Sequence, residues 1–254
     1  MTYEIQPAGA LLKHGPSPFP FVRVAGKTAQ ALLAQLRHAH PDTTPVIWGE
    51  EDQASRLFEF FDEPDLPSVE SILESAASAD GNSAIAEHRR REEERTRALF
   101  AEKGWDYPDA EGDDPADAGV VPPGTGAHDR LLGFDDYRTG QPLAEVLIGL
   151  IPTPRSYEVP AYLRFGGWNE CPPPEIHVAL ARQWNERFGA RLVVNTSDVM
   201  EFELERPVAT IEEARELVPV LYSYCNDIID QGVGSREALA RTLHRGRFWY
   251  FWWD

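Results

Sequence analysis

The chain has 254 residues, of which 42% are hydrophobic and 11% aromatic, a composition that excludes general disorder and allows a sizeable folded core. Acidic residues outnumber lysine and arginine by 42 to 24, and the net charge of −18 argues against nucleic acid or an anionic membrane as a partner. No apolar run approaches the ~20 residues of a membrane helix, and two cysteines without a secretion signal predict a cytoplasmic protein.

Residues 1–66 carry the pattern of a β-α-β piece. Residues 19–24 are predicted as a short strand, and leucines at helical spacing predict a helix that starts at Gly26 and stops before Pro41. A second, buried strand is predicted at residues 45–49. Two strands connected in this way run parallel to each other if they pair in one sheet.

Residues 67–142 differ in character from the first part. Ser68 is predicted to cap a helix, and residues 83–103 form a second, strongly charged helix with Glu87–Arg91 and Glu93–Arg97 spaced for ion pairs. Aspartates, prolines and glycines dominate the stretch that follows. We interpret that stretch as an acidic linker, with partner binding as the less favoured alternative.

Residues 143–254 are predicted to form an α+β domain. The expected strands are 146–151, 191–196, 199–204 and 248–253, with an extended segment at 159–165 and helices at 174–188, 210–224 and 235–244. This is the βαββαβ order of a ferredoxin-like mixed sheet with helices on one face. The N-terminal β-α-β piece is expected to extend or cover that sheet, so that the chain forms one interlocked body.

Six consecutive aromatic residues, from Phe248 to Trp253, are the most distinctive feature of the chain. In a strand, the even-numbered rings of this run would face one side of the sheet and the odd-numbered rings the other. Because neither face is polar, the pattern predicts a central strand that is covered on both sides.

Two polar loops, residues 164–172 and 225–232, interrupt the C-terminal domain, and their motifs resemble those of a known family. The motifs are Val159-Pro160-Ala161, Gly166-Gly167-Trp168-Asn169, Cys171-Pro172, Phe188-Gly189-Ala190, Asp227-Ile228-Ile229-Asp230-Gln231-Gly232 and Phe251-Trp252-Trp253-Asp254. Over residues 143–254 the sequence resembles a bacterial domain-of-unknown-function family, number 4253. The expected proline after Cys225 is replaced by Asn226. The resemblance implies a domain boundary and no particular chemistry.

The first loop supplies most of the candidate binding residues. Trp168 and Asn169 could form an aromatic floor with an amide above it; the favoured alternative is a core tryptophan and an asparagine that caps the turn. The predicted binding residues are Arg164, Trp168, Asn169, Glu170 and Gln231.

Three residues are candidates for catalysis. Cys171 could be a nucleophile, but His177 lies six positions further on, which local geometry places out of reach, so a buried structural cysteine is favoured. Asp227 and Asp230 could divide acid and base roles, although capping of a turn is the favoured alternative. No metal-ligand spacing occurs, and neither a metal nor a cofactor is predicted.

Together these features favour a non-catalytic binding module that engages a protein partner through an acidic surface and the Trp168 loop. A basic partner would best match the charge. The alternative is a small-ligand-binding protein or a hydrolase-type enzyme that uses Asn169, Cys171, Asp227 and Asp230, which requires the two polar loops to meet in one pocket. The sequence predicts no nucleic acid or membrane partner, and it does not specify an oligomeric state.

Overall fold

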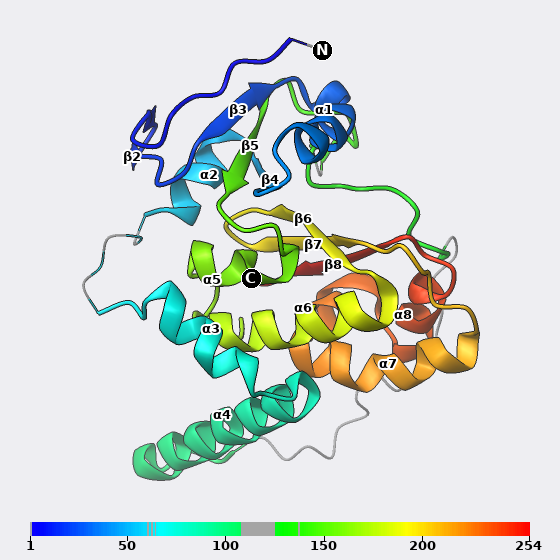
Figure 1. Cartoon of the computed structure of the whole chain (residues 1–254). Coiled ribbons are helices and arrows are strands. Elements are labelled where there is room, and N and C mark those ends of the chain that lie inside the picture. The colour runs from blue at the N-terminus through cyan, green and yellow to red at the C-terminus, as the bar shows by residue number, and fades with distance from the viewer. Residues whose placement is uncertain (1, 60, 62, 64, 108–124, 137) are drawn as a thin grey trace.

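A six-stranded mixed sheet passes through the whole molecule (Figure 1), which confirms the α+β class. The computed structural model describes residues 2–59, 61, 63, 65–107, 125–136 and 138–254. The sheet has the order β3-β5-β4-β6-β7-β8, and a separate hairpin pairs β1 with β2. The strands are β1 (Leu11–Leu12), β2 (Gly15–Pro16), β3 (Phe21–Val24), β4 (Thr44–Gly49), β5 (Val146–Ile151), β6 (Arg191–Asn195), β7 (Val199–Glu203) and β8 (Phe248–Trp252).

Strands from the beginning and the end of the chain interleave in this sheet. β3 and β4 run in the same direction but do not pair, because β5 lies between them and is antiparallel to both. Gly149 of β5 allows this close approach, since a Cβ there would lie 1.7 Å from the ring of Trp48. The ferredoxin-like order predicted for the C-terminal part is not confirmed, because β5 pairs with N-terminal strands and β4 pairs in parallel with β6.

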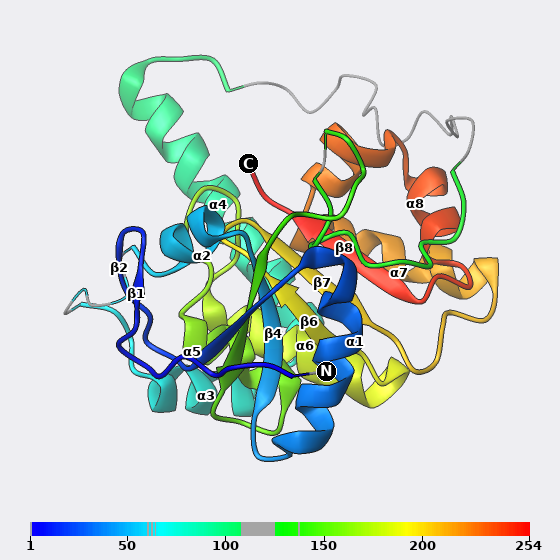
Figure 2. The same ribbon diagram turned by 90° about the horizontal axis from the view of Figure 1, so that it is seen from above.

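Helices cover both faces of the sheet (Figures 1 and 2). Leucines of α1 pack on one face, and α5, α6 and α7 pack on the other. The helices are α1 (Gly26–Ala39), α2 (Glu51–Leu57), α3 (Val69–Ala77), α4 (Gly81–Lys103), α5 (Val159–Leu163), α6 (Pro174–Phe188), α7 (Ile211–Tyr224) and α8 (Arg236–Leu243), with a 3₁₀ turn at Ser156–Glu158 and a π-helical turn at Ile228–Val233.

Local sequence signals determine where several helices begin and end. The hydroxyls of Ser68, Thr210 and Ser235 accept hydrogen bonds from backbone N–H groups three residues later and so cap α3, α7 and α8. Gly189 ends α6 with a left-handed φ of 63°. The prediction of an extended segment at residues 159–165 is wrong, because Pro160 occupies the first turn of α5, where its missing N–H has no cost.

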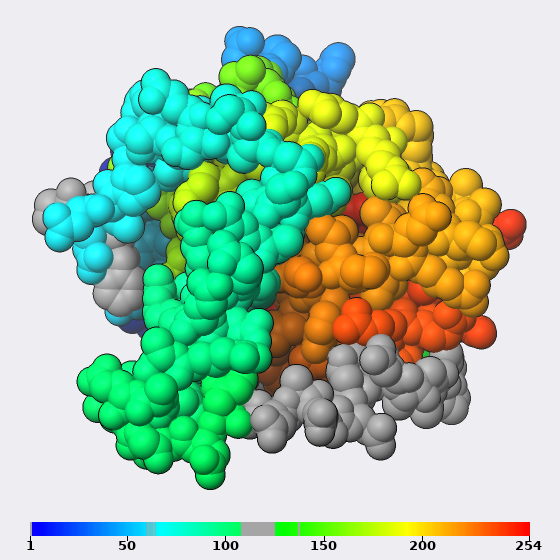
Figure 3. All heavy atoms as spheres, turned by 90° about the horizontal axis from the view of Figure 1, so that it is seen from below, coloured from blue at the N-terminus to red at the C-terminus, as the bar shows by residue number. Residues whose placement is uncertain are grey.

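The charged helix α4 packs only near its beginning. Ile85 is fully buried, whereas most later residues are exposed and the helix extends away from the body beside α7 (Figures 2 and 3). The predicted ion pairs form, between Glu87 and Arg91 and, at 2.7 Å, between Glu93 and Arg97. Of the helices in the described ranges, none combines the length and apolarity that crossing a bilayer requires.

The aromatic strand β8 is core, but its predicted central position is wrong. It forms the end of the sheet and pairs only with β7. Burial comes instead from the surrounding helices: Trp249 and Trp253 are each 1% exposed, and Phe251 stacks on Trp184 of α6 at 5.5 Å. The predicted alternation holds, because Phe248 packs into the separate cluster on the opposite face.

Candidate functional site

The first polar loop folds back on itself just before α6. Gly166 and Gly167 adopt φ values of 106° and 82°, and a Cβ on Gly166 would lie 2.0 Å from the carbonyl of Pro172. The backbone N–H of Cys171 closes the turn on the carbonyl of Trp168 at 2.9 Å. This geometry leaves residues 167–170 at the surface and Cys171 in the core.

Trp168 occupies an intermediate position between core and solvent. Its ring is half-buried and packs edge-to-face on Phe165, with the ring centroids 6.2 Å apart. Trp168 is therefore partly the core tryptophan that the favoured alternative predicts. Asn169 and Glu170 are exposed beside it. The loop therefore exposes one side of the packed Trp168 ring and the polar side chains of Asn169 and Glu170 to solvent.

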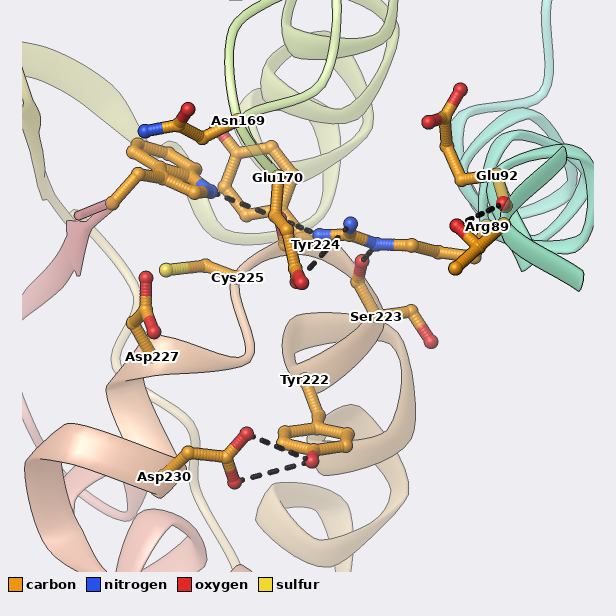
Figure 4. Close-up of polar contacts among 12 residues, drawn as sticks. Arg89, Glu92, Asn169, Glu170, Tyr222, Ser223, Tyr224, Cys225, Asp227 and Asp230 are labelled. Carbon is orange, nitrogen blue, oxygen red and sulfur yellow. Dashed lines mark hydrogen bonds and ion pairs between the residues drawn. The ribbon is translucent and has the colours of Figure 1, made fainter. Parts of the chain in front are cut away.

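The two polar loops meet around the residue that follows the aromatic strand. The Asn169 side-chain amide donates to the carbonyl of Asp254 at 2.8 Å, and the Asp254 N–H donates to the Asp227 carboxylate at 3.2 Å. Figure 4 shows Asn169, Glu170 and Asp227 arranged around Cys225. The two loops are therefore in contact, but the shared pocket that the ligand or enzyme alternative requires is not seen among the described residues, because the cavity that Asp227 lines includes neither Asn169 nor Cys171.

Asp227 and Asp230 lie close in sequence but face different partners. Asp227 accepts a hydrogen bond of 2.8 Å from Gln231, whereas Asp230 accepts from the hydroxyl of Tyr222 at 3.1 Å (Figure 4). The two carboxylates therefore do not form an acid-base pair. In the described ranges, no three His, Cys, Asp or Glu side chains are grouped to hold a metal ion.

Arg89 of α4 completes the site, and sequence reasoning missed it. Its Nε donates to the carbonyl of Ser223 at 2.6 Å, and another nitrogen lies 3.6 Å from the carboxylate of Glu170 (Figure 4). Arg89 lies in the helix predicted as strongly charged, and the ion-pair spacing along that helix does not predict a contact with a distant loop. Arg164, by contrast, points elsewhere and donates to the carbonyl of Phe61 at 2.8 Å.

Cys171 and His177 are in contact, which corrects the expectation that they lie out of reach. The thiol sulfur and His177 Nε2 are 3.4 Å apart, because the folded-back loop returns Cys171 to the side of α6. His177 Nδ1 lies 2.6 Å from the hydroxyl of Tyr224, and all three side chains are buried. Burial raises the pKa of the Cys171 thiol well above its usual value and lowers the pKa of His177 to about 3, so both groups are neutral near pH 7.

The match to a known family covers both polar loops of the site. Residues 147–254 match the model of a domain of unknown function, DUF4253. The matched part contains nearly all of β5 and the strands β6 to β8, whereas Arg89 and the segment 125–136 lie outside it. Searches of curated proteins and of solved structures gave no match.

Proposed function

We propose that this protein is a non-catalytic binding module that engages a basic segment of a partner protein. The binding face consists of the Trp168 loop (residues 166–170) and the Asp227 loop (residues 226–231). The observation that carries the proposal is their linkage, since Asn169 and Asp227 each bind a backbone group of Asp254. A face fixed in this way loses little conformational entropy on binding, which favours affinity.

The chemistry of the face suits a positively charged partner. Glu170, Asp230 and Asp254 are exposed, and neither Asp227 nor Asp254 forms an ion pair with any described residue. Carboxylates without a cation attract basic segments and accelerate their encounter. Trp168 adds a rigid aromatic surface of the kind that often dominates an interface.

The candidate catalytic groups favour binding over hydrolysis. Cys171 is 2% exposed and its raised pKa keeps it as a thiol, whereas a nucleophile must be a thiolate that reaches its substrate. The neighbouring His177 is neutral and fully buried. We further propose the cytoplasm as the location, because a reducing compartment suits two free, buried thiols.

Calorimetric titration with a short lysine- and arginine-rich peptide tests the proposal, with an acidic peptide as the negative probe. We expect binding of the basic peptide to weaken from about 50 to about 200 mM salt. Trp168→Ala, and the double change Glu170→Gln with Asp254→Asn, should each weaken it roughly tenfold.

The matched control is Glu93→Gln with Glu94→Gln, which removes the same charge from the exposed part of α4. This control should bind like the wild type. Equal losses in the control and in the site variants would show that only net charge matters, and the proposal would be wrong.

A further inference from the structure

A cavity of about 360 Å³ lies beside the aromatic strand. All five residues of β8 line it, and its other walls come from the π-helical turn, from α8 and from the segment 125–132. Most of the wall is apolar, with Ile228, Val233 and Leu243 among the lining residues. Its size lies in the range of roughly 300–1,000 Å³ that is typical of small-molecule sites.

At this cavity the edge of β8 presents backbone groups that have no partner in the part of the chain that the structure describes. The Phe248 N–H donates to the carbonyl of His128 at 3.0 Å on the outer side, whereas the Trp253 N–H donates to the carbonyl of Asp198 at 3.1 Å on the β7 side. In an edge strand, the backbone N–H and C=O groups of successive residues point alternately toward the neighbouring strand and away from it. The N–H and C=O of Tyr250, like those of Phe248, therefore point away from β7. Neither group has a hydrogen-bond partner among the described residues.

The edge is closed on both sides of Tyr250. At Phe248 the segment containing His128 occupies the outer side, and beyond Tyr250 the carbonyl of Trp252 accepts from the Cys225 thiol at 2.9 Å. A peptide strand that passed along β8 would have to displace both contacts. The enclosed position therefore favours a compact ligand over an added strand.

The ionisable groups of the cavity favour an uncharged ligand. Burial lowers the pKa of His128 and raises that of Tyr250 well above its usual value, so both side chains are neutral near pH 7. Among the described residues of the lining, Asp227 is the one acidic residue, and none is a lysine or arginine. A phosphate or carboxylate group would find no counter-ion here.

We propose that this cavity binds a small, planar, uncharged heterocycle whose adjacent donor and acceptor pair with the C=O and N–H of Tyr250. The apolar walls would cover the faces of the ring, and the two backbone groups would fix its edge. Nucleobases and lactams have this chemistry. The cavity shares Asp227 and Ile228 with the proposed protein-binding face, but ligand binding there does not depend on the engagement of a protein partner.

Titration of the ¹⁵N-labelled full chain with adenine, uracil, AMP and an uncharged tripeptide tests the proposal. We expect adenine or uracil to shift the Tyr250 amide resonance and to slow its hydrogen exchange roughly tenfold at saturation, as a buried hydrogen bond does. AMP should bind more weakly than adenine. The proposal is overturned if no heterocycle shifts this resonance at millimolar concentration, if AMP binds more tightly than adenine, or if the tripeptide alone protects the amide.

Two variants locate the site. Val233→Phe places a larger ring in the cavity and should abolish the shift, whereas Val220→Phe, on a half-buried position of α7 outside the cavity, should retain it. Undiminished binding to the Val233 variant would place the ligand elsewhere and overturn the proposal. If that variant fails to fold, the wild-type titration still decides.

Discussion

The side-chain amide of Asn169 and the backbone carbonyl of Asp254 are joined by a hydrogen bond of 2.8 Å. Asn169 also has a φ of 46°, in the left-handed region that asparagine and glycine tolerate better than other residues. Backbone and side chain of this one residue therefore both contribute to the joining of the two loops.

Substitution of Asn169 separates these two contributions. Asn169→Gly retains the backbone conformation and removes the amide, and we expect a loss of about 1 kcal/mol in the free energy of unfolding. Asn169→Ala also strains the backbone and should cost about 1 kcal/mol more. Urea denaturation measures both losses, and two variants as stable as the wild type would show that this hydrogen bond does not hold the loops.

The two cysteines should be inert in the folded protein. Cys171 and Cys225 are buried, and burial raises the pKa of Cys171 well above its usual value and that of Cys225 to about 12. We expect a thiol reagent at pH 7.5 to modify neither residue until urea unfolds the chain. Rapid modification of Cys171 in the native protein would contradict its assignment as structural and revive the nucleophile hypothesis.

Two tryptophans of β8 provide a matched test of the core. Trp249 is 1% exposed and contacts Trp184 and Phe188, whereas Trp252 is only partly buried on the other face. Trp249→Ala should cost about 3–5 kcal/mol, or prevent folding, and Trp252→Ala should cost less. Thermal and urea unfolding measure the difference, and a reversed order would contradict the assignment of the two faces.

Glu201 makes stability depend on pH. It is buried on β7 opposite Tyr250, its carboxylate accepts hydrogen bonds from the N–H groups of Leu132 and Gly133, and burial raises its pKa from 4.5 to about 7. The folded state therefore binds this proton more strongly than the unfolded state. Its contribution to stability is complete below pH 4.5 and is lost as the pH rises through about 7.

Glu201→Gln removes this titration. Between pH 5 and pH 8 the wild type should lose up to about 3 kcal/mol more stability than the variant, on the basis of ~1.4 kcal/mol for each unit of pKa shift. Comparing the two proteins cancels the contributions of nearby Asp135 and Arg130, which also act on this pKa. Parallel stability curves from urea denaturation at several pH values would contradict the prediction.

Local patterns predicted much of this fold. The hydroxyl cap at Ser68, the helices predicted at residues 174–188 and 210–224 and the two faces of β8 all depend on residues close in sequence. Such features are fixed by backbone geometry and periodicity, which a single sequence contains.

The features that the sequence did not predict depend on how distant segments meet. The position of β5 between β3 and β4, and of β8 at the edge, results from tertiary pairing that no local pattern encodes. Arg89 reaches Glu170 only because α4 packs beside α7. Cys171 reaches His177 through a turn of the loop, a conformation that helical spacing does not describe.

Site-specific photocrosslinking in the cells that produce the protein tests the proposed binding face most directly. A photoreactive amino acid replaces Glu170 in one variant and Glu94, an exposed glutamate of α4, in the control. We predict a crosslinked partner from position 170 that is absent from position 94 and disappears when Trp168→Ala is added. The same products from both positions, or none from position 170, would contradict the proposal.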